Sequence, residues 1–72
     1  MAYSETIYGD ALARATTDLA RDDVVSLRET LRQAKNLGND FFLRLTIELT
    51  NLIKSRQVAT KIDIEQLHDI AG

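Results

Sequence analysis

Cysteine and proline are both absent from this 72-residue sequence, and glycine occurs only three times. Without cysteine there are no disulfide bonds, thiolate zinc sites, thiol nucleophiles or redox switches. Without proline, few points along the chain force a helix to end. No apolar run approaches the roughly 18 residues of a membrane span, and the N-terminus lacks the charged-then-apolar order of a signal peptide. We therefore expect a cytoplasmic protein.

An excess of charge of one sign is also absent. The net charge is −2, and the fractions of charged residues (28%) and hydrophobic residues (44%) are ordinary for a globular protein. This balance gives no reason to expect a nucleic acid or a membrane as partner. A domain of this length buries only about 60% of its unfolded surface, so small chains are often stabilised by self-association. We expect one domain over residues 1–72 that acts as a homo-oligomer or complex subunit.

Apolar residues recur at three- and four-residue spacing through most of the chain, which predicts an all-α fold. The pattern indicates three main helices and a short C-terminal helix, over about 4–20, 23–36, 40–57 and 63–71. Each start offers a side chain suited to N-capping. The expected caps are Ser4, Asp22 or Asp23, Asn39 or Asp40, and Asp63. Lys35–Gly38 is the expected C-cap of the second helix, with Gly38 in the left-handed conformation.

Each expected helix has an apolar face that predicts a contribution to one core. In the first three helices these residues are Ile7, Tyr8, Ala11, Leu12, Ala15 and Leu19; Val24, Leu27, Leu31 and Ala34; and Phe41, Phe42, Leu45, Leu49, Leu52 and Ile53. The fourth helix adds Leu67 and Ile70. Gly9 either weakens the first helix by about 1 kcal/mol relative to alanine or admits a neighbouring helix closely.

The third expected helix carries more apolar residues than one core face needs. At 100° per residue its main stripe spans about 120°, and Leu43 and Ile47 fall nearly opposite that stripe. Phe41 and Phe42 are adjacent and point about 100° apart, so either both lie in a wide core or one lies at an interface. We predict that Leu43 and Ile47, with Phe41 or Phe42 at the edge, form an interface with a second copy or with another protein.

A basic ridge on the second expected helix is the second candidate surface. Arg28, Arg32 and Lys35 lie at i, i+4 and i+7, so they share one side of the helix. Such a ridge can meet phosphates or an acidic partner. Glu29 partly neutralises it, and a solvated helix face explains the pattern equally well. A dimeric nucleic-acid-binding regulator that uses this ridge is therefore the first alternative function.

Catalytic machinery is not evident in the sequence. The single histidine is His68, and no serine lies in a glycine-rich elbow beside an oxyanion hole. Glu65-x-x-His68 has the spacing found in di-metal carboxylate bundles, where Glu48 from each copy of a dimer would complete the ligand set. So short a match also arises by chance, and a solvated acidic surface explains it. We expect no catalytic residue, metal site or cofactor, with a di-metal bundle as the second alternative.

The segment Gln57–Leu67 faintly resembles a helix-turn-helix element. In that element the second helix enters the DNA major groove. Here this helix would bring Glu65, His68 and Asp69 towards phosphates, and the repulsion argues against docking on DNA. The leading hypothesis is therefore a non-enzymatic helical protein-interaction module of regulatory or adaptor type.

Overall fold

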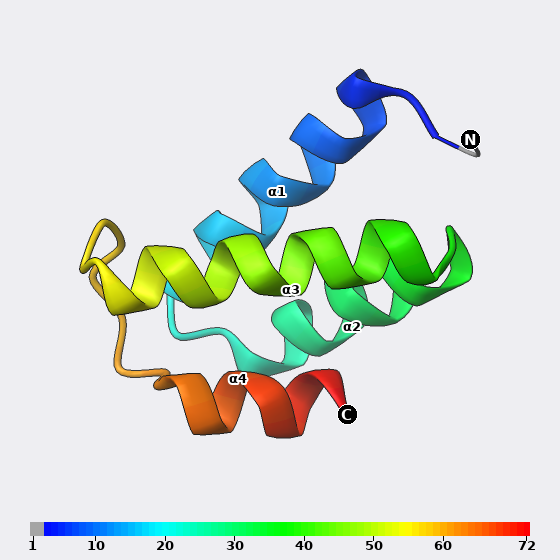
Figure 1. The fold of residues 1–72 in the computed structure, drawn as a ribbon. Helices are drawn as coiled ribbons and strands as arrows, with labels where there is room; N and C mark the ends of the chain where they lie inside the picture. The colour runs from blue at the N-terminus through cyan, green and yellow to red at the C-terminus, as the bar shows by residue number, and fades with distance from the viewer. Residues whose placement is uncertain (1–2) are drawn as a thin grey trace.

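Four α-helices make up most of the chain in a computed structural model, which describes residues 3–72 (Figure 1). They are α1 (Glu5–Ala20), α2 (Val24–Asn36), α3 (Asn39–Lys54) and α4 (Ile64–Ala71). The predicted all-α fold of three main helices and a short fourth helix is confirmed. The predicted bounds are correct to about one residue everywhere except at the end of α3. Among the described residues, no helix is long and apolar enough to cross a lipid bilayer.

Three of the four predicted N-caps are confirmed. At each one, a side-chain oxygen accepts a hydrogen bond from the backbone N–H three residues later, which satisfies one of the unpaired donors of the first turn. These caps are Ser4 with Ile7 (3.2 Å), Asp23 with Ser26 (3.0 Å) and Asp63 with Gln66 (2.8 Å). The starts of α1, α2 and α4 therefore follow from local chemistry.

The start of α3 differs from the prediction. Gly38 is the residue before the helix, and no side chain caps it. Its carbonyl accepts the N–H of Phe42 at 3.1 Å, so the helix begins one residue before Asp40. Gly38 has a φ of 125°, a conformation that glycine adopts without strain, and this allows the sharp turn from α2 into α3. The carboxylate of Asp40 lies in the first turn of α3 instead of capping it.

The end of α3 lies at Lys54, three residues before the predicted end. The N–H of Gln57 bonds the carbonyl of Leu52 (3.0 Å), and the N–H of Arg56 bonds that of Ile53 (3.1 Å), which is a Schellman termination. Arg56 takes the left-handed conformation there, with a φ of 58°. Since the chain is not helical from Gln57 to Asp63, the helix-turn-helix interpretation of this segment is wrong.

Helices α2 and α3 form the middle of the bundle. They contact each other, and both contact α1 and α4. In Figure 1, α3 crosses in front of α2, with α1 above it and α4 below it. The largest fully buried side chains are Phe41, Leu19, Leu27, Leu31, Leu45, Leu49 and Leu67, all of them predicted core residues. Together with α2 behind it, the two outer helices cover three sides of α3 and leave its front uncovered.

Two residues of α1 depart from the predicted core. Ile7 is 46% exposed, because Tyr8, about 100° further round the helix, takes the inward position. Asp18 was not predicted to be buried, yet only 6% of it is exposed. Its carboxylate accepts hydrogen bonds from the hydroxyls of Ser26 (2.7 Å) and Thr30 (2.8 Å). These bonds replace water around the buried charge and join α1 to α2.

The two loops at one end of the bundle are also joined. Asp22, at the turn between α1 and α2, accepts hydrogen bonds from the Thr60 hydroxyl (2.7 Å) and the Lys61 N–H (2.6 Å). These two bonds hold the pKa of Asp22 below its usual value, and the bond from the Lys61 backbone has the larger effect. Because Thr60 and Lys61 lie only a few residues before α4, the contact helps to fix α4 against the bundle.

Candidate protein-interaction surface

The uncovered side of α3 carries two large aliphatic residues at its centre. Leu43 is 58% exposed and Ile47 is 53% exposed, and they lie one helical turn apart. Asp40 and Lys54 are exposed on the same side, one before and one after the aliphatic pair. At 100° per residue these four residues fall within an arc of about 60°. We refer to Asp40, Leu43, Ile47 and Lys54 as the outer face of α3.

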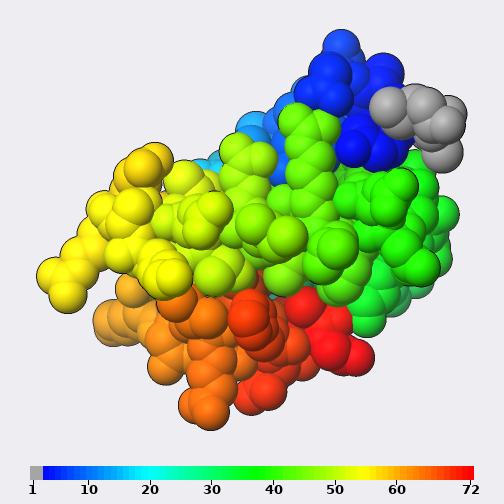
Figure 2. Space-filling model, in the orientation of Figure 1, coloured from blue at the N-terminus to red at the C-terminus, as the bar shows by residue number. Residues whose placement is uncertain are grey.

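Two open grooves run along the outer face, one on each side. Leu43, Ile47 and Asn51 line both grooves, so they form a crest between them. The groove on the α1 side is completed by Asp40, Arg44, Glu48, Leu52 and Gln57. The groove on the α4 side is completed by Lys35, Phe42, Thr46, Thr50, His68, Ala71 and Gly72. Figure 2 shows α3 crossing the middle of this face of the molecule, between α1 and α4.

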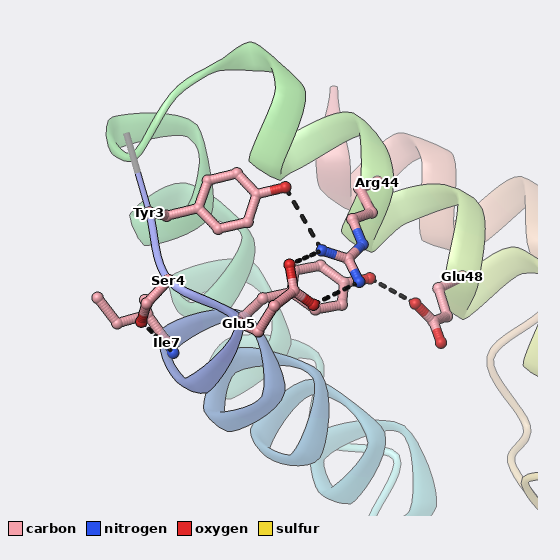
Figure 3. A network of polar contacts seen from close by, with 7 residues as sticks. Tyr3, Ser4, Glu5, Ile7, Arg44 and Glu48 are labelled. Atoms are coloured by element: carbon pink, nitrogen blue, oxygen red, sulfur yellow. Dashed lines mark hydrogen bonds and ion pairs between the residues drawn. The ribbon is translucent and has the colours of Figure 1, made fainter. Parts of the chain in front are cut away.

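A polar network fixes the wall of the groove on the α1 side (Figure 3). The guanidinium of Arg44 lies 3.7 Å from the centre of the Tyr8 ring and donates to both carboxylate oxygens of Glu5, at 2.9 and 3.0 Å. The Tyr8 hydroxyl donates to Glu48 at 2.6 Å. The hydrogen bonds from Arg44 lower the pKa of Glu5, whereas burial and then Glu48 raise that of Tyr8. Arg44 and Glu48 are thus both held against α1.

The wall on the α4 side is held by fewer polar contacts. The Thr50 hydroxyl donates to the carbonyl of Thr46 (2.8 Å), and its oxygen lies 3.3 Å from Nε2 of His68. Since that hydroxyl has a single proton, we assign Nε2 of His68 as the donor of the second contact. The ammonium of Lys35 lies 5.0 Å from the centre of the Phe42 ring. The exposed lining of this groove is predominantly apolar, and Lys35 and His68 add an ammonium and an imidazole group to it.

The two adjacent phenylalanines are separated by the fold. Phe41 is fully buried and makes an edge-to-face contact with Tyr8, with ring centres 5.4 Å apart. Phe42 is only partly buried and lines the groove on the α4 side. Of the predicted interface residues, the structure therefore brings Leu43, Ile47 and Phe42 to one surface and places Phe41 in the core. Their role in binding stays a prediction.

The other exposed aliphatic residues do not form a comparable surface. Val25 is 75% exposed on α2, and it lines none of the grooves described. Ile7 and Leu37 line a smaller groove whose walls include the charged side chains of Asp10 and Arg14. Of the surfaces compared, the one on α3 has an apolar crest with a groove on each side.

The basic ridge of α2 is partly neutralised within the chain. Arg32 makes an ion pair with Glu29, and its Nε donates to that carboxylate at 3.0 Å. Lys35 lies over the Phe42 ring. Arg28 is the one member of the ridge without an ion pair or aromatic contact among residues 3–72. The use of this ridge in nucleic-acid binding stays a prediction, and no contact among residues 3–72 favours it.

Within one chain, the residues of the di-metal interpretation lie on different flanks of α3, and their assembly between two copies stays a prediction. Glu48 is hydrogen-bonded to Tyr8 on the α1 flank of α3, whereas His68 contacts Thr50 on the α4 flank. Glu65 and His68 are both exposed. Within the described part of the chain, no group of three or more His, Cys, Asp or Glu residues is arranged to hold a metal ion.

Comparison of the chain with protein-family models, with curated proteins and with solved structures gives no match. The proposals that follow therefore rest on the physical chemistry of the chain itself.

Proposed function

We propose that this protein is a non-enzymatic protein-interaction module of regulatory or adaptor type, and that it docks through the outer face of α3 onto a second copy of itself. One observation carries the proposal. Leu43 and Ile47, the aliphatic pair at the centre of the outer face, remain more than half exposed. The other leucines of α3 are wholly or partly buried. Burial of such side chains is the main favourable contribution to protein association.

The shape of the surface supports self-association. When two identical surfaces meet, the crest of each copy can pack into a groove beside the crest of the other copy. The walls of the first groove are held by Arg44 and Glu48, whose contacts with α1 already exist in the single chain. Little rearrangement is therefore needed on binding, which limits the entropic cost of association.

Ile47→Asp is the substitution that tests the proposal. Complete burial of an isoleucine is worth about 1.5–3 kcal/mol, and roughly half of that is still unrealised in the single chain. Two copies lose two such contributions, about 1.5–3 kcal/mol, which weakens a dimer roughly 10- to 100-fold. The buried carboxylates would weaken it further. The chain itself should stay helical, because Ile47 is 53% exposed.

The experiment is sedimentation equilibrium over a wide protein concentration range, with circular dichroism of the same samples. Val25→Asp is the matched control, because it makes the same aliphatic-to-acidic change at a residue that is 75% exposed and lies on α2. We expect the wild type and Val25→Asp to dimerise alike and Ile47→Asp to stay monomeric. A wild type that is monomeric throughout, or an Ile47→Asp variant that dimerises normally, would overturn the proposal.

A further inference from the structure

Two opposite charges lie at equal distances from the centre of the outer face. Asp40 precedes Ile47 by seven residues and Lys54 follows it by seven. Seven residues are two turns of helix, so each charge lies about 10 Å along the axis from Ile47, on the same side of the helix. Both residues are exposed, and neither has an ion-pair partner among residues 3–72. The outer face thus has an acidic end, an aliphatic centre and a basic end.

We propose that two copies pack outer face to outer face with antiparallel α3 helices, about a two-fold axis near Ile47, so that Asp40 of each copy lies against the partner's Lys54. This inference rests on the proposed function and specifies its partner and geometry. A two-fold axis at the midpoint of this pattern places the acidic end of each copy opposite the basic end of the other. The dimer therefore has two symmetry-related contacts between Asp40 and Lys54. The partner is therefore a surface of this same pattern, which a second copy supplies.

A parallel arrangement of the same faces is disfavoured by the same charges. It would bring Asp40 against the partner's Asp40 and Lys54 against the partner's Lys54, and like charges at close range repel. The helix dipoles act in the same direction, because antiparallel helices bring the positive end of one near the negative end of the other. The aliphatic pair drives association under the proposed function, and the two charges determine its direction.

Charge reversal distinguishes the two arrangements. In the antiparallel dimer, Asp40→Lys or Lys54→Asp converts two attractive contacts into two repulsive ones, which should weaken association roughly tenfold at low salt. The double variant Asp40→Lys/Lys54→Asp restores both attractions and should recover the wild-type dissociation constant. In a parallel dimer, each single reversal replaces one like-charge contact with another and leaves the constant unchanged. High salt should shrink the differences in the antiparallel case.

A matched variant controls for the change of net charge and of the first helical turn in Asp40→Lys. Glu65→Lys makes the same reversal of sign in the first turn of α4, at an exposed residue that lines neither groove of the outer face. It should leave the dissociation constant within about twofold of the wild type. Circular dichroism of every variant verifies that the helices are intact.

A distance measurement tests the direction of packing independently. Because the chain has no cysteine, Ser55→Cys takes a spin label at one exposed site just beyond α3. Ser55 lies eight residues beyond Ile47, so antiparallel packing separates the two labelled backbones by about 24 Å along the helix axes, whereas parallel packing brings them to about 10 Å.

The possible outcomes separate the two proposals. The antiparallel dimer is supported if both single reversals weaken dimerisation, the double variant recovers it, and the distance between the spin labels is long. If the wild type dimerises and Ile47→Asp does not, but the single reversals have no effect or the label distance is short, the antiparallel arrangement is wrong and the proposed function stands. If the wild type is monomeric at all concentrations, both are wrong.

Discussion

The hydroxyl of Thr30 offers a sharp test of how α1 and α2 are held together. Thr30 is 4% exposed, and its Oγ1 lies 2.8 Å from the carboxylate of Asp18 and 3.0 Å from the carbonyl of Ser26. The hydroxyl has one proton, and the charged, closer acceptor takes it. Thr30→Val keeps the shape of the side chain and removes this donor. Among residues 3–72, the buried Asp18 carboxylate then keeps the Ser26 hydroxyl as its only side-chain donor.

The expected loss is large for so small a domain. A hydrogen bond to a charged group is worth about 1.5–3 kcal/mol, and a chain of this length has a total free energy of unfolding of roughly 4–11 kcal/mol. At about 4–8 °C per kcal/mol, the melting temperature should fall by roughly 6–24 °C. The measurement is urea and thermal unfolding followed by circular dichroism, at one fixed protein concentration because dimerisation would shift the transition.

Two variants serve as controls for the loss of the Thr30 hydroxyl. Thr30→Ser keeps the hydroxyl and loses only a methyl group, which costs about 1 kcal/mol. Thr17→Val removes a hydroxyl that is exposed and donates to the carbonyl of Ala13 in its own helix, so it should change stability by no more than about 0.5 kcal/mol. A Thr30→Val variant as stable as the wild type, or no less stable than Thr17→Val, would refute this account of the buried carboxylate.

Two further predictions concern pH and glycine. Burial, and then the hydrogen bond to Glu48, raise the pKa of Tyr8 above its ordinary value, so the stability it contributes is complete below pH about 10 and is lost as the pH rises through the raised folded value. Tyr8→Phe should remove this alkaline loss in urea unfolding between pH 8 and 12, and an equally steep decline in the variant would contradict the assignment. A methyl group added at Gly9 would have no neighbour within 4 Å, so Gly9→Ala should stabilise α1 by about 1 kcal/mol, whereas Gly38→Ala should cost about 1–3 kcal/mol because of its φ of 125°. The measurement is the melting temperature of the Gly9→Ala and Gly38→Ala variants. If Gly38→Ala raised it, a side chain at position 38 would not strain the turn.

The parts of the fold that the sequence predicts correctly depend on local chemistry. The caps at Ser4, Asp23 and Asp63 bond to backbone three residues away, and the core stripes follow helical periodicity. The end of α3 could not be predicted, because its left-handed residue is Arg56 and not a glycine. The idea that Gly9 admits a close helix neighbour is also wrong, because the space beside it is open.

Long-range contacts explain the remaining differences. Asp18 lies on the apolar side of α1, but its burial depends on the hydroxyls of Ser26 and Thr30, which α2 supplies. The periodicity of α3 predicts that Leu43 and Ile47 point away from the main stripe, and both are exposed. The two grooves beside them depend on where α1 and α4 pack, which one helix alone does not determine. The cytoplasmic location, the absence of enzymatic activity and the interface itself stay predictions.

The most direct test of the central claim is a concentration series of amide chemical shifts by NMR, for which a chain of this size is well suited. Self-association through the outer face predicts that shifts change with protein concentration along α3 around Leu43, Ile47 and Lys54, and in the walls of the two grooves. Amides near Val25 and Arg28 on α2 should not change. Shifts that are independent of concentration, or changes confined to the basic ridge of α2, would contradict the account.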